Sequence, residues 1–327
     1  MVWNCRGLGN PCAIRALNKL LRDQAPSLVF LSETKLLTGE MDVVRRRVGF
    51  ENGFSIDCRN RGGGLALLWR VGVELSIVSY SVGHIDAVIK DSVMGQHWRF
   101  IGFYGPPKLS QRKHSRQLLR RLASLYSLPW LCVGDFNEIL SSEEKCGGTI
   151  RTQTQMDAFR EALGGASFYD LGFRGSRYTW ARGRSPTRRI CERLGRAVAS
   201  PEWSSLFPAS MVRHLSSSWS DHVPICISIK HTLNAFNNKK RRGDPVASLV
   251  SCAQQALTAL QSWGRRKLGH LKGRIKKLFD KLETIQFNSS HHLTEELAIK
   301  KELDSLLEQE ELYWKQRLRV SWLQEGD

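Results

Sequence analysis

The sequence predicts an α/β protein in which short buried strands alternate with surface helices, followed by a C-terminal helical hairpin. Three observations carry this prediction: apolar runs of strand length that stop at turn formers, helical periodicity between several of these runs, and a seam of leucines toward the C-terminus. With 327 residues, 41% hydrophobic and 24% charged, the chain can bury a sizeable core, which excludes disorder and fibrous repeats as descriptions of the whole.

Six short runs have the composition of buried strands, because they are rich in aliphatic, β-branched or aromatic residues and end at Gly, Pro, Ser or Asp. In chain order they are Leu28–Ser32, Gly64–Trp69, Val73–Tyr80, Trp98–Tyr104, Leu131–Gly134 and Val223–Ile229. Two stretches are amphipathic: Ile14–Ala25, before the first run, and Arg112–Tyr126, between the fourth and the fifth. In the second, leucines recur at helical spacing above a basic face, so we expect both to be helices that cover a sheet.

The composition and the hydrophobic periodicity of the sequence change after the last of these strands. Residues 232–245 are polar, basic and rich in turn formers, as expected of a linker. Beyond them an apolar seam alternates steps of three and four, which is typical of a helix that packs on another helix: Leu268, Leu271, Ile275, Leu278, Leu282 and Ile285. A second apolar stripe follows a turn-like segment at 288–290, so residues 246–327 are predicted to form an antiparallel hairpin. Self-association of two chains through the same seam is the alternative.

The charge balance favours a polyanionic partner. Lys and Arg total 49 against 31 Asp and Glu, a formal net charge of +18. Residues 235–327 hold 17 basic and 12 acidic side chains, so the positive charge belongs mainly to the α/β part. The eight cysteines include no C-x-x-C pair, which argues against a disulfide framework or a zinc ribbon. Because no apolar run reaches 18 residues and no signal-peptide pattern is present, we expect no membrane segment. The expected location is the nucleus, with the cytoplasm as the alternative.

Polar residues follow four apolar segments, at the strand ends where α/β folds commonly build their sites. These segments are Trp3-Asn4, Ser32-Glu33-Thr34, Gly134-Asp135-Phe136-Asn137 and Ser220-Asp221-His222. Glu33 offers the hard oxygen ligand that Mg²⁺ prefers. Asp135 and Asn137 would share a face of an extended segment, so one could hold or deprotonate a water while the other donates to a phosphate oxygen. A histidine beside an aspartate, His222, suits the stabilisation of charge on a phosphoryl group.

In this order and context the polar residues resemble the motifs of the endonuclease/exonuclease/phosphatase family, over residues 1–231. The matching positions are Asn4, Glu33, Tyr104, Gly-Asp-Phe-Asn at 134–137 and Ser-Asp-His-x-Pro at 220–224. Further segments are similar to the apurinic-type endonuclease domain of plant non-LTR (LINE-type) retrotransposon polyproteins: 3–11, 31–35, 62–69, 103–105 and 178–180. Residues 313–327 resemble the stretch that leads into the reverse transcriptase of such polyproteins, so the resemblance implies an element truncated before that domain, or a host reading frame derived from such an element.

The resemblance implies both a fold and a reaction. The fold is a four-layer α/β/β/α sandwich of two mixed sheets with outer helices. The reaction is nicking of one DNA strand by a Mg²⁺-dependent phosphodiesterase, with Mn²⁺ as an alternative metal and RNA as an alternative partner. Carried over by position, the implied roles are metal binding by Glu33, Asn4 and Asp221, phosphate contact by Tyr104, Asn137 and His222, activation of water by Asp135, and support of substrate binding by Asn4, Thr179 and Ser220.

One position departs from the family pattern. The family reads Arg-Leu-Asp-Arg, whose Asp supports the catalytic His, whereas residues 193–196 are Arg-Leu-Gly-Arg. Gly195 therefore replaces the supporting carboxylate, and Glu192, three residues away, would face the other side of a strand. By analogy with a protease triad whose orienting Asp is neutralised, turnover would fall by roughly 10⁴. We therefore expect a folded domain with strongly reduced nicking.

Two other functions are compatible with the same sequence features. The same basic fold could bind nucleic acid without chemistry, which salt-dependent DNA binding without metal-dependent cleavage would select. A phosphatase of lipid or inositol phosphates is the other reading. The net positive charge and the loop at 177–196, rich in Trp, Tyr and Arg, argue against it.

Overall fold

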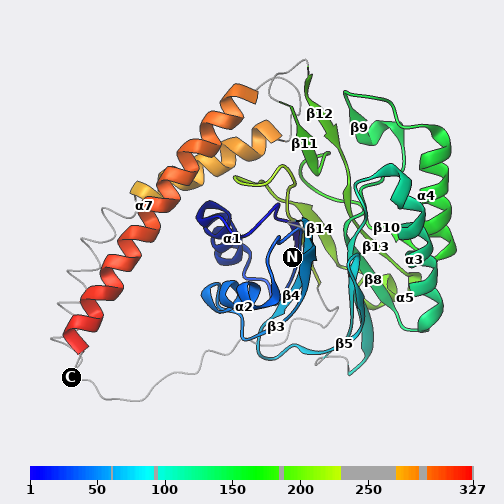
Figure 1. Cartoon of the computed structure of the whole chain (residues 1–327), viewed down its shortest axis with the longest axis horizontal. Helices are drawn as coiled ribbons and strands as arrows, with labels where there is room; N and C mark the ends of the chain where they lie inside the picture. The colour runs from blue at the N-terminus through cyan, green and yellow to red at the C-terminus, as the bar shows by residue number, and fades with distance from the viewer. Residues whose placement is uncertain (60–61, 92–94, 184–187, 230–269, 287–292, 326–327) are drawn as a thin grey trace.

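Two six-stranded mixed sheets pack face to face and helices cover both outer surfaces, so the sandwich has four layers (Figure 1). The computed structural model describes residues 1–59, 62–91, 95–183, 188–229, 270–286 and 293–325, with the side chains of the last helix as far as Trp314. The predicted α/β class and the four-layer form implied by the resemblance are both confirmed. The predicted linker at 232–245 lies outside the described residues.

The first sheet joins the N-terminal strands to the last strands of the sandwich. Its order is β14 (Met211–His214), β15 (Ile225–Ser228), β1 (Val2–Asn4), β2 (Leu28–Ser32), β4 (Gly62–Trp69) and β3 (Asn52–Arg59). β1 runs parallel to β2, with Asn4 opposite Ser32, and antiparallel to β15. This pairing brings the first residues of the chain next to the segment that precedes β15.

The second sheet holds the middle of the chain. Its order is β10 (Tyr169–Asp170), β13 (Gly195–Ala199), β8 (Trp130–Asp135), β7 (His97–Tyr104), β6 (His84–Lys90) and β5 (Glu74–Ser81). β7 and β8 are parallel, with Tyr104 opposite Asp135, and Gly195 on β13 flanks Asp135 on its other side. A smaller sheet at one end consists of β11 (Trp180–Arg182), β12 (Ile190–Glu192) and β9 (Lys145–Cys146), with the turn η2 (Ser142–Glu144) leading into β9.

Period-two alternation along the strands divides the core into layers. In β2, Phe30 packs between the sheets, whereas Val29 and Leu31 face the outer helices. In β8, Val133 points inward and Cys132 outward. The helices on the first sheet are α1 (Pro11–Gln24) and α2 (Thr38–Arg47), and those on the second are α3 (Arg112–Leu125), preceded by η1 (Leu109–Gln111), and α4 (Gln153–Gly165), while α5 (Pro201–Leu206) packs beside β8.

Local chemistry sets the element ends that the sequence prediction placed a few residues away. α1 begins at Pro11, before the predicted start at Ile14, because Asn10 caps it by accepting a hydrogen bond from the Cys12 N–H at 2.8 Å. β15 begins at Ile225 and not at Val223, because Pro224 has no N–H to give to a neighbouring strand.

The described part of the C-terminal region forms the predicted helical hairpin, built from a helix at 270–286 and α7 (Leu293–Glu325), whereas residues 246–269 of the predicted range lie outside the described residues. Arg274 pairs with Glu302 and Lys281 with Glu295, so the two helices run antiparallel. Their shared core contains Ile275, Leu282, Ile299, Leu303, Leu306 and Leu307. The hairpin lies along the side of the sandwich that carries α1 (Figure 1). Within the described residues, no helix combines the length and apolarity needed to cross a bilayer.

Candidate active site

Four strand ends meet at one edge of the sandwich. β1 and β2 are parallel neighbours in the first sheet, and β7 and β8 are parallel neighbours in the second. The carboxyl ends of parallel strands lie at the same sheet edge, which is where α/β folds place polar side chains. Asn4 and Glu33 arrive from the first sheet, and Tyr104 and Asp135 from the second. The packing of the two sheets therefore assembles these residues into one cluster.

Asn4 links the two sheets. Its Nδ2 donates to Glu33 Oε1 at 3.1 Å and to Asp135 Oδ2 at 2.9 Å, and it lies 3.4 Å from His222 Nε2. The side chain is buried, so the amide hydrogens have no water to replace these acceptors. One asparagine thus holds two carboxylates that lie more than a hundred positions apart in the sequence.

Glu33 is held by three donors. Tyr104 Oη donates to its Oε1 at 2.9 Å, and Arg6 Nη1 lies 3.1 Å from its Oε2. Burial works to raise the pKa of Glu33, but the hydrogen bond from Asn4, the charge of Arg6 and the hydrogen bond from Tyr104 outweigh it and leave the pKa below its ordinary value. Glu33 is therefore an ionised carboxylate at neutral pH.

Asp135 and Asn137 interact through a turn and not across a strand face. β8 ends at Asp135, and Asn137 adopts a left-handed conformation with φ of 55°, which departs from the extended segment that we predicted. The Asn137 N–H donates to Asp135 Oδ1 at 3.1 Å, and its side-chain amide donates to the Gly105 carbonyl at 2.8 Å. Burial raises the pKa of Asp135 above its ordinary value, although His222 and Asn4 oppose the shift.

The segment before β15 brings His222 and Asp221 to the same cluster. His222 Nδ1 lies 3.5 Å from Asp135 Oδ2, and His222 Nε2 lies 3.9 Å from Asp221 Oδ1. The Ser220 hydroxyl accepts the His222 N–H at 3.0 Å and donates to the Asn4 carbonyl at 2.8 Å. Trp3 Nε1 also donates to the His222 carbonyl at 3.0 Å. These bonds fix the histidine to the end of β1.

Thr179 and Ser220, predicted to support substrate binding, lie behind the cluster. Both are buried, and the Thr179 hydroxyl accepts the Gly195 N–H at 2.7 Å. The space beside Gly195 is partly filled, because a Cβ added there would lie 2.9 Å from Ile225 Cδ1 and 3.4 Å from the Thr179 hydroxyl oxygen. The carboxylates nearest to the imidazole come instead from Asp135 and Asp221.

Arg6 is a member of the cluster that the sequence motifs do not indicate. Its guanidinium contacts Glu33 on one side and Asp221 on the other, and Trp180 Nε1 donates to the same Asp221 at 3.0 Å. The sequence offered only its place two residues after Asn4 and directly before a glycine, Gly7. Because the protein contains many basic residues, the sequence alone does not single out this arginine as the partner of two carboxylates.

The donor chemistry of the cluster fits a magnesium ion in part. In the portion of the chain that the structure describes, no three His, Cys, Asp or Glu side chains converge as a ready-made metal cage. Mg²⁺ needs fewer protein ligands than that, because one or two carboxylates suffice when water and phosphate oxygens complete its shell. Glu33 and Asp221 are such a pair, and both face the point that the Arg6 guanidinium occupies.

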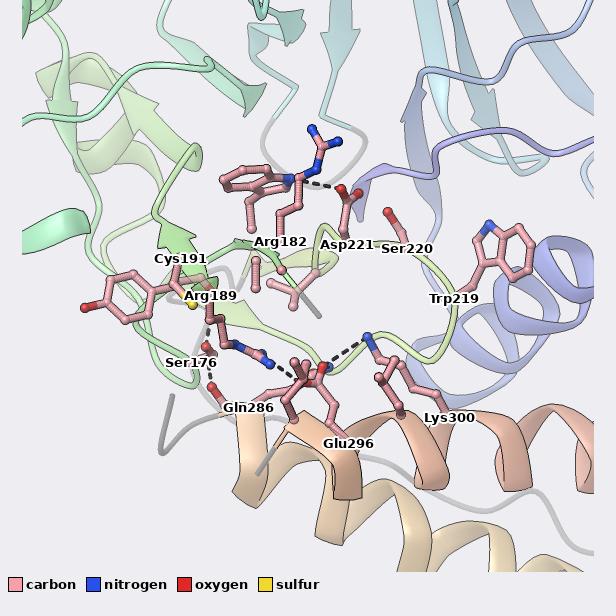
Figure 2. A pocket seen from close by; sticks show the side chains of 17 residues that line it. Ser176, Arg182, Arg189, Cys191, Trp219, Ser220, Asp221, Gln286, Glu296 and Lys300 are labelled. Carbon is pink, nitrogen blue, oxygen red and sulfur yellow. Dashed lines mark hydrogen bonds and ion pairs between the residues drawn. The ribbon is translucent and has the colours of Figure 1, made fainter. Parts of the chain in front are cut away.

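A cavity of about 290 Å³ opens next to Asp221, between the small sheet and the C-terminal hairpin (Figure 2). Its walls combine aromatic and basic side chains from the sandwich with polar side chains from the hairpin: Tyr178, Trp180, Arg182, Arg189 and Trp219 from the first, and Gln286, Glu296 and Lys300 from the second. Arg189 and Lys300 both point toward Glu296 (Figure 2). The hairpin therefore contributes to the surroundings of the site.

Two packed mixed sheets with outer helices, and a cluster of acid, amide and imidazole groups at their shared edge, define a nuclease/phosphatase type of sandwich fold. The chain belongs to the Endonuclease/Exonuclease/phosphatase family, whose model matches residues 1–222. No curated protein gave a significant match.

Solved structures share the fold at low sequence identity. An AP endonuclease from Archaeoglobus fulgidus is 16% identical with a TM-score of 0.53, over 70% of this chain and 97% of that one. The endonuclease domain of TRAS1, a telomere-specific non-LTR retrotransposon, is 13% identical with a TM-score of 0.50, over 71% and 98%. The 3′ phosphatase NExo from Neisseria, bound to a product DNA hairpin, is 16% identical with a TM-score of 0.51, over 70% and 98%.

Proposed function

We propose that the chain is a Mg²⁺-dependent phosphodiesterase that nicks DNA, derived from a plant non-LTR retrotransposon and slowed by the loss of a carboxylate at Gly195. One observation carries this proposal: the Asn4 side chain donates hydrogen bonds to Glu33 of one sheet and to Asp135 of the other, and it lies 3.4 Å from His222 Nε2. DNA as substrate is supported by the net charge of +18 and by the structural neighbours, which include an AP endonuclease, a retrotransposon endonuclease domain and a 3′ phosphatase bound to a DNA hairpin. A nuclear location follows from that substrate.

Each residue has a role that its geometry permits. Glu33 and Asp221 would hold the metal, which when bound supplies positive charge to a phosphate oxygen. Asp135 would accept the proton of the attacking water, and its raised pKa brings it closer to the working pH of a general base. The phosphate would receive hydrogen bonds from Asn4, Tyr104, Asn137 and His222. Thr179 and Ser220 would support the substrate indirectly, by holding the loops behind the cluster.

The decisive experiment is nicking of supercoiled plasmid with Mg²⁺ by the wild-type chain, Gly195→Asp and the double variant Gly195→Asp with Ile225→Val. The second change makes room, since Ile225 lies where the new Cβ must go. We expect slow nicking by the wild type and a gain of up to about 10⁴ when the supporting carboxylate returns. Glu33→Gln and chelation with EDTA should each abolish cleavage. Equal rates in wild type and both Gly195 variants would show that the glycine is not the cause of slow turnover.

A nucleic-acid-binding remnant without chemistry is the second candidate. Gly195 and the Arg6 guanidinium between two predicted metal ligands both favour it. Salt-dependent DNA binding with no metal-dependent cleavage, even after the Gly195→Asp change, would select this function.

A further inference from the structure

Arg6 makes four polar contacts with two carboxylates of the site. Its Nη1 lies 3.1 Å and 3.3 Å from the two oxygens of Glu33, its Nη2 lies 3.1 Å from Asp221 Oδ2, and its Nε lies 3.0 Å from Asp221 Oδ1. A planar guanidinium presents its donors as a fixed fork, which lets one side chain bridge two acids. Glu33 follows β2 and Asp221 precedes β15, so the bridge spans separate parts of the first sheet.

The backbone at Arg6 is held in a conformation that non-glycine residues rarely adopt. Its φ is 55°, and the following Gly7 has a φ of 107°. A left-handed conformation costs a residue with a side chain about 1 kcal/mol, so it persists where the surroundings compensate. The contacts of the guanidinium with Glu33 and Asp221, together with the hydrogen bond from the Arg6 N–H to Asn4 Oδ1 at 3.3 Å, are that compensation.

The guanidinium lies between the two carboxylates to which the proposed function assigns the metal. Glu33 is buried, and among the described residues its carboxylate receives hydrogen bonds from charged Arg6 and from the neutral side chains of Asn4 and Tyr104. Without Arg6, Glu33 and Asp221 would share a negatively charged point of the site, which favours a cation with two hard oxygen ligands. With Arg6 in place, one of these two negative charges is already neutralised.

We infer that Arg6 is a resident counter-ion that competes with the divalent metal for Glu33 and Asp221. Metal loading then requires the guanidinium to leave both carboxylates, and the wild-type chain binds metal weakly. This inference rests on the proposed metal-dependent function. It adds a control on cation binding that is separate from Gly195, which concerns the histidine.

The test measures binding of Mn²⁺ alone to the full chain, by isothermal titration and by the EPR signal of free Mn²⁺, without DNA. We expect Arg6→Ala to lower the Mn²⁺ dissociation constant by about tenfold relative to the wild type. Arg6→Lys keeps the charge but lacks the fork, so its affinity should be intermediate. Arg46→Ala, which removes the same charge from an exposed position on α2, should match the wild type. The double variant Arg6→Ala with Glu33→Gln should lose the gain.

A competition experiment uses the same probe. Guanidinium chloride at a non-denaturing concentration, compared with equal NaCl, should weaken Mn²⁺ binding by Arg6→Ala and leave the wild type unchanged. Circular dichroism checks that the variants fold. If Arg6→Ala does not fold, Arg6→Lys becomes the test, and an affinity of Arg6→Lys for Mn²⁺ equal to that of the wild type overturns the inference. Equal and measurable affinity in wild type and Arg6→Ala, or an equal gain in Arg46→Ala, overturns it while the proposed function stands. No Mn²⁺ binding by any chain overturns it together with the proposed metal dependence.

Discussion

At the scale of single residues, backbone strain is concentrated around the site. Four of the non-glycine residues with positive φ in the described chain stand on the loops after β1, β2 and β8: Arg6, Glu33, Lys35 and Asn137. Left-handed residues survive where side-chain contacts over-determine them, and they cluster at functional sites. Glu33 receives bonds from Asn4 and Tyr104, and Asn137 bonds the Gly105 carbonyl. These contacts therefore hold the polar groups in place, in spite of the backbone strain, before any ligand arrives.

Asn4 gives the first prediction at this scale. Asn4→Ala leaves Glu33 and Asp135 without their shared donor in a buried place, so the free energy of unfolding should fall by about 1–3 kcal/mol. Nicking by a chain with the restored carboxylate at 195 should fall by roughly 10² or more. Urea unfolding and plasmid nicking measure the two effects. Asn18→Ala, on α1 outside the cluster, is the matched control, and equal effects of both variants would contradict a linking role for Asn4.

Sequence reasoning could find most of the site because polar residues directly follow apolar strands. Asn4, Glu33 and Asp135 were predicted on that ground, and the structure places them within hydrogen-bond distance. Arg6 could not be found that way, because its partners lie far along the chain and arginine is common in this sequence. The sequence predicts that Asn137 lies on an extended segment with Asp135. In the structure the strand ends at Asp135, and Asn137 adopts a left-handed conformation in the turn that follows.

At the scale of elements, the C-terminal hairpin is attached to the sandwich by ion pairs. Arg15 on α1 contacts Asp304 at 3.0 Å, Arg22 contacts Glu310 at 2.8 Å, and Arg189 beside β12 contacts Glu296 at 2.6 Å. The end of the helix at 270–286 also reaches the loop before His222, because Gln286 exchanges hydrogen bonds with the backbone of Ser217. Ser217 Oγ in turn accepts the Ser220 N–H at 3.1 Å. The hairpin thereby supports the loop that carries Asp221 and His222.

Glu296 makes this attachment sensitive to acid. Burial opposes ionisation, but Lys300 and Arg189 outweigh it and lower the pKa of Glu296 from 4.5 to about 2. A carboxyl with a lowered pKa in the folded state contributes stability above pH 4.5, and that contribution is lost as the pH falls toward about 2.

Glu296→Gln should therefore unfold at a lower temperature than the wild type at pH 6, with the gap closing as the pH falls from about 4.5 toward 2. Thermal unfolding followed by circular dichroism at a series of pH values measures the gap. Glu283→Gln, an exposed acid on the same hairpin, should show no such pH-dependent difference. A gap that stays constant with pH would show that the charge of Glu296 does not stabilise the docked hairpin.

Three of the strands that sequence reasoning missed, β6, β9 and β12, have physical explanations. In β6 (His84–Lys90) the apolar pattern is interrupted by Asp86. This aspartate can be fully buried because Arg99 on β7 pairs with it at 2.6 Å. A buried charge needs a partner from another strand, and the sequence of one strand cannot reveal that partner. β9 and β12, with two and three residues, are too short to carry a pattern. The hairpin was predictable because its apolar residues repeat at helical spacing. Its docking on the sandwich depends on individual ion pairs, which leave no periodic pattern in the sequence and could not be predicted.

At the scale of the whole molecule, the hairpin changes where the positive charge is displayed. Acidic residues of α7 pair with arginines on the side of the sandwich that carries α1 and α2, including Arg15, Arg22 and Arg47. Near the cavity beside Asp221, Arg182 at the end of β11 is exposed. A nucleic-acid strand that reaches the cluster would therefore meet uncovered positive charge at the site edge and a neutralised flank along the hairpin.

This distribution predicts how DNA binding depends on salt. Each phosphate contact that is lost should reduce the slope of log K against log salt concentration by about 1, so Arg182→Ala should lower both affinity and slope. Arg46→Ala removes the same charge from α2 and should leave the slope unchanged, because α2 lies on the flank and not at the site edge. Fluorescence anisotropy with a labelled duplex over a range of NaCl concentrations, in EDTA to prevent cleavage, measures both. An equal loss of slope in Arg182→Ala and Arg46→Ala would mean that DNA responds to the net charge of the molecule and binds no defined face. That result would contradict the assignment of the site edge as the DNA-binding surface.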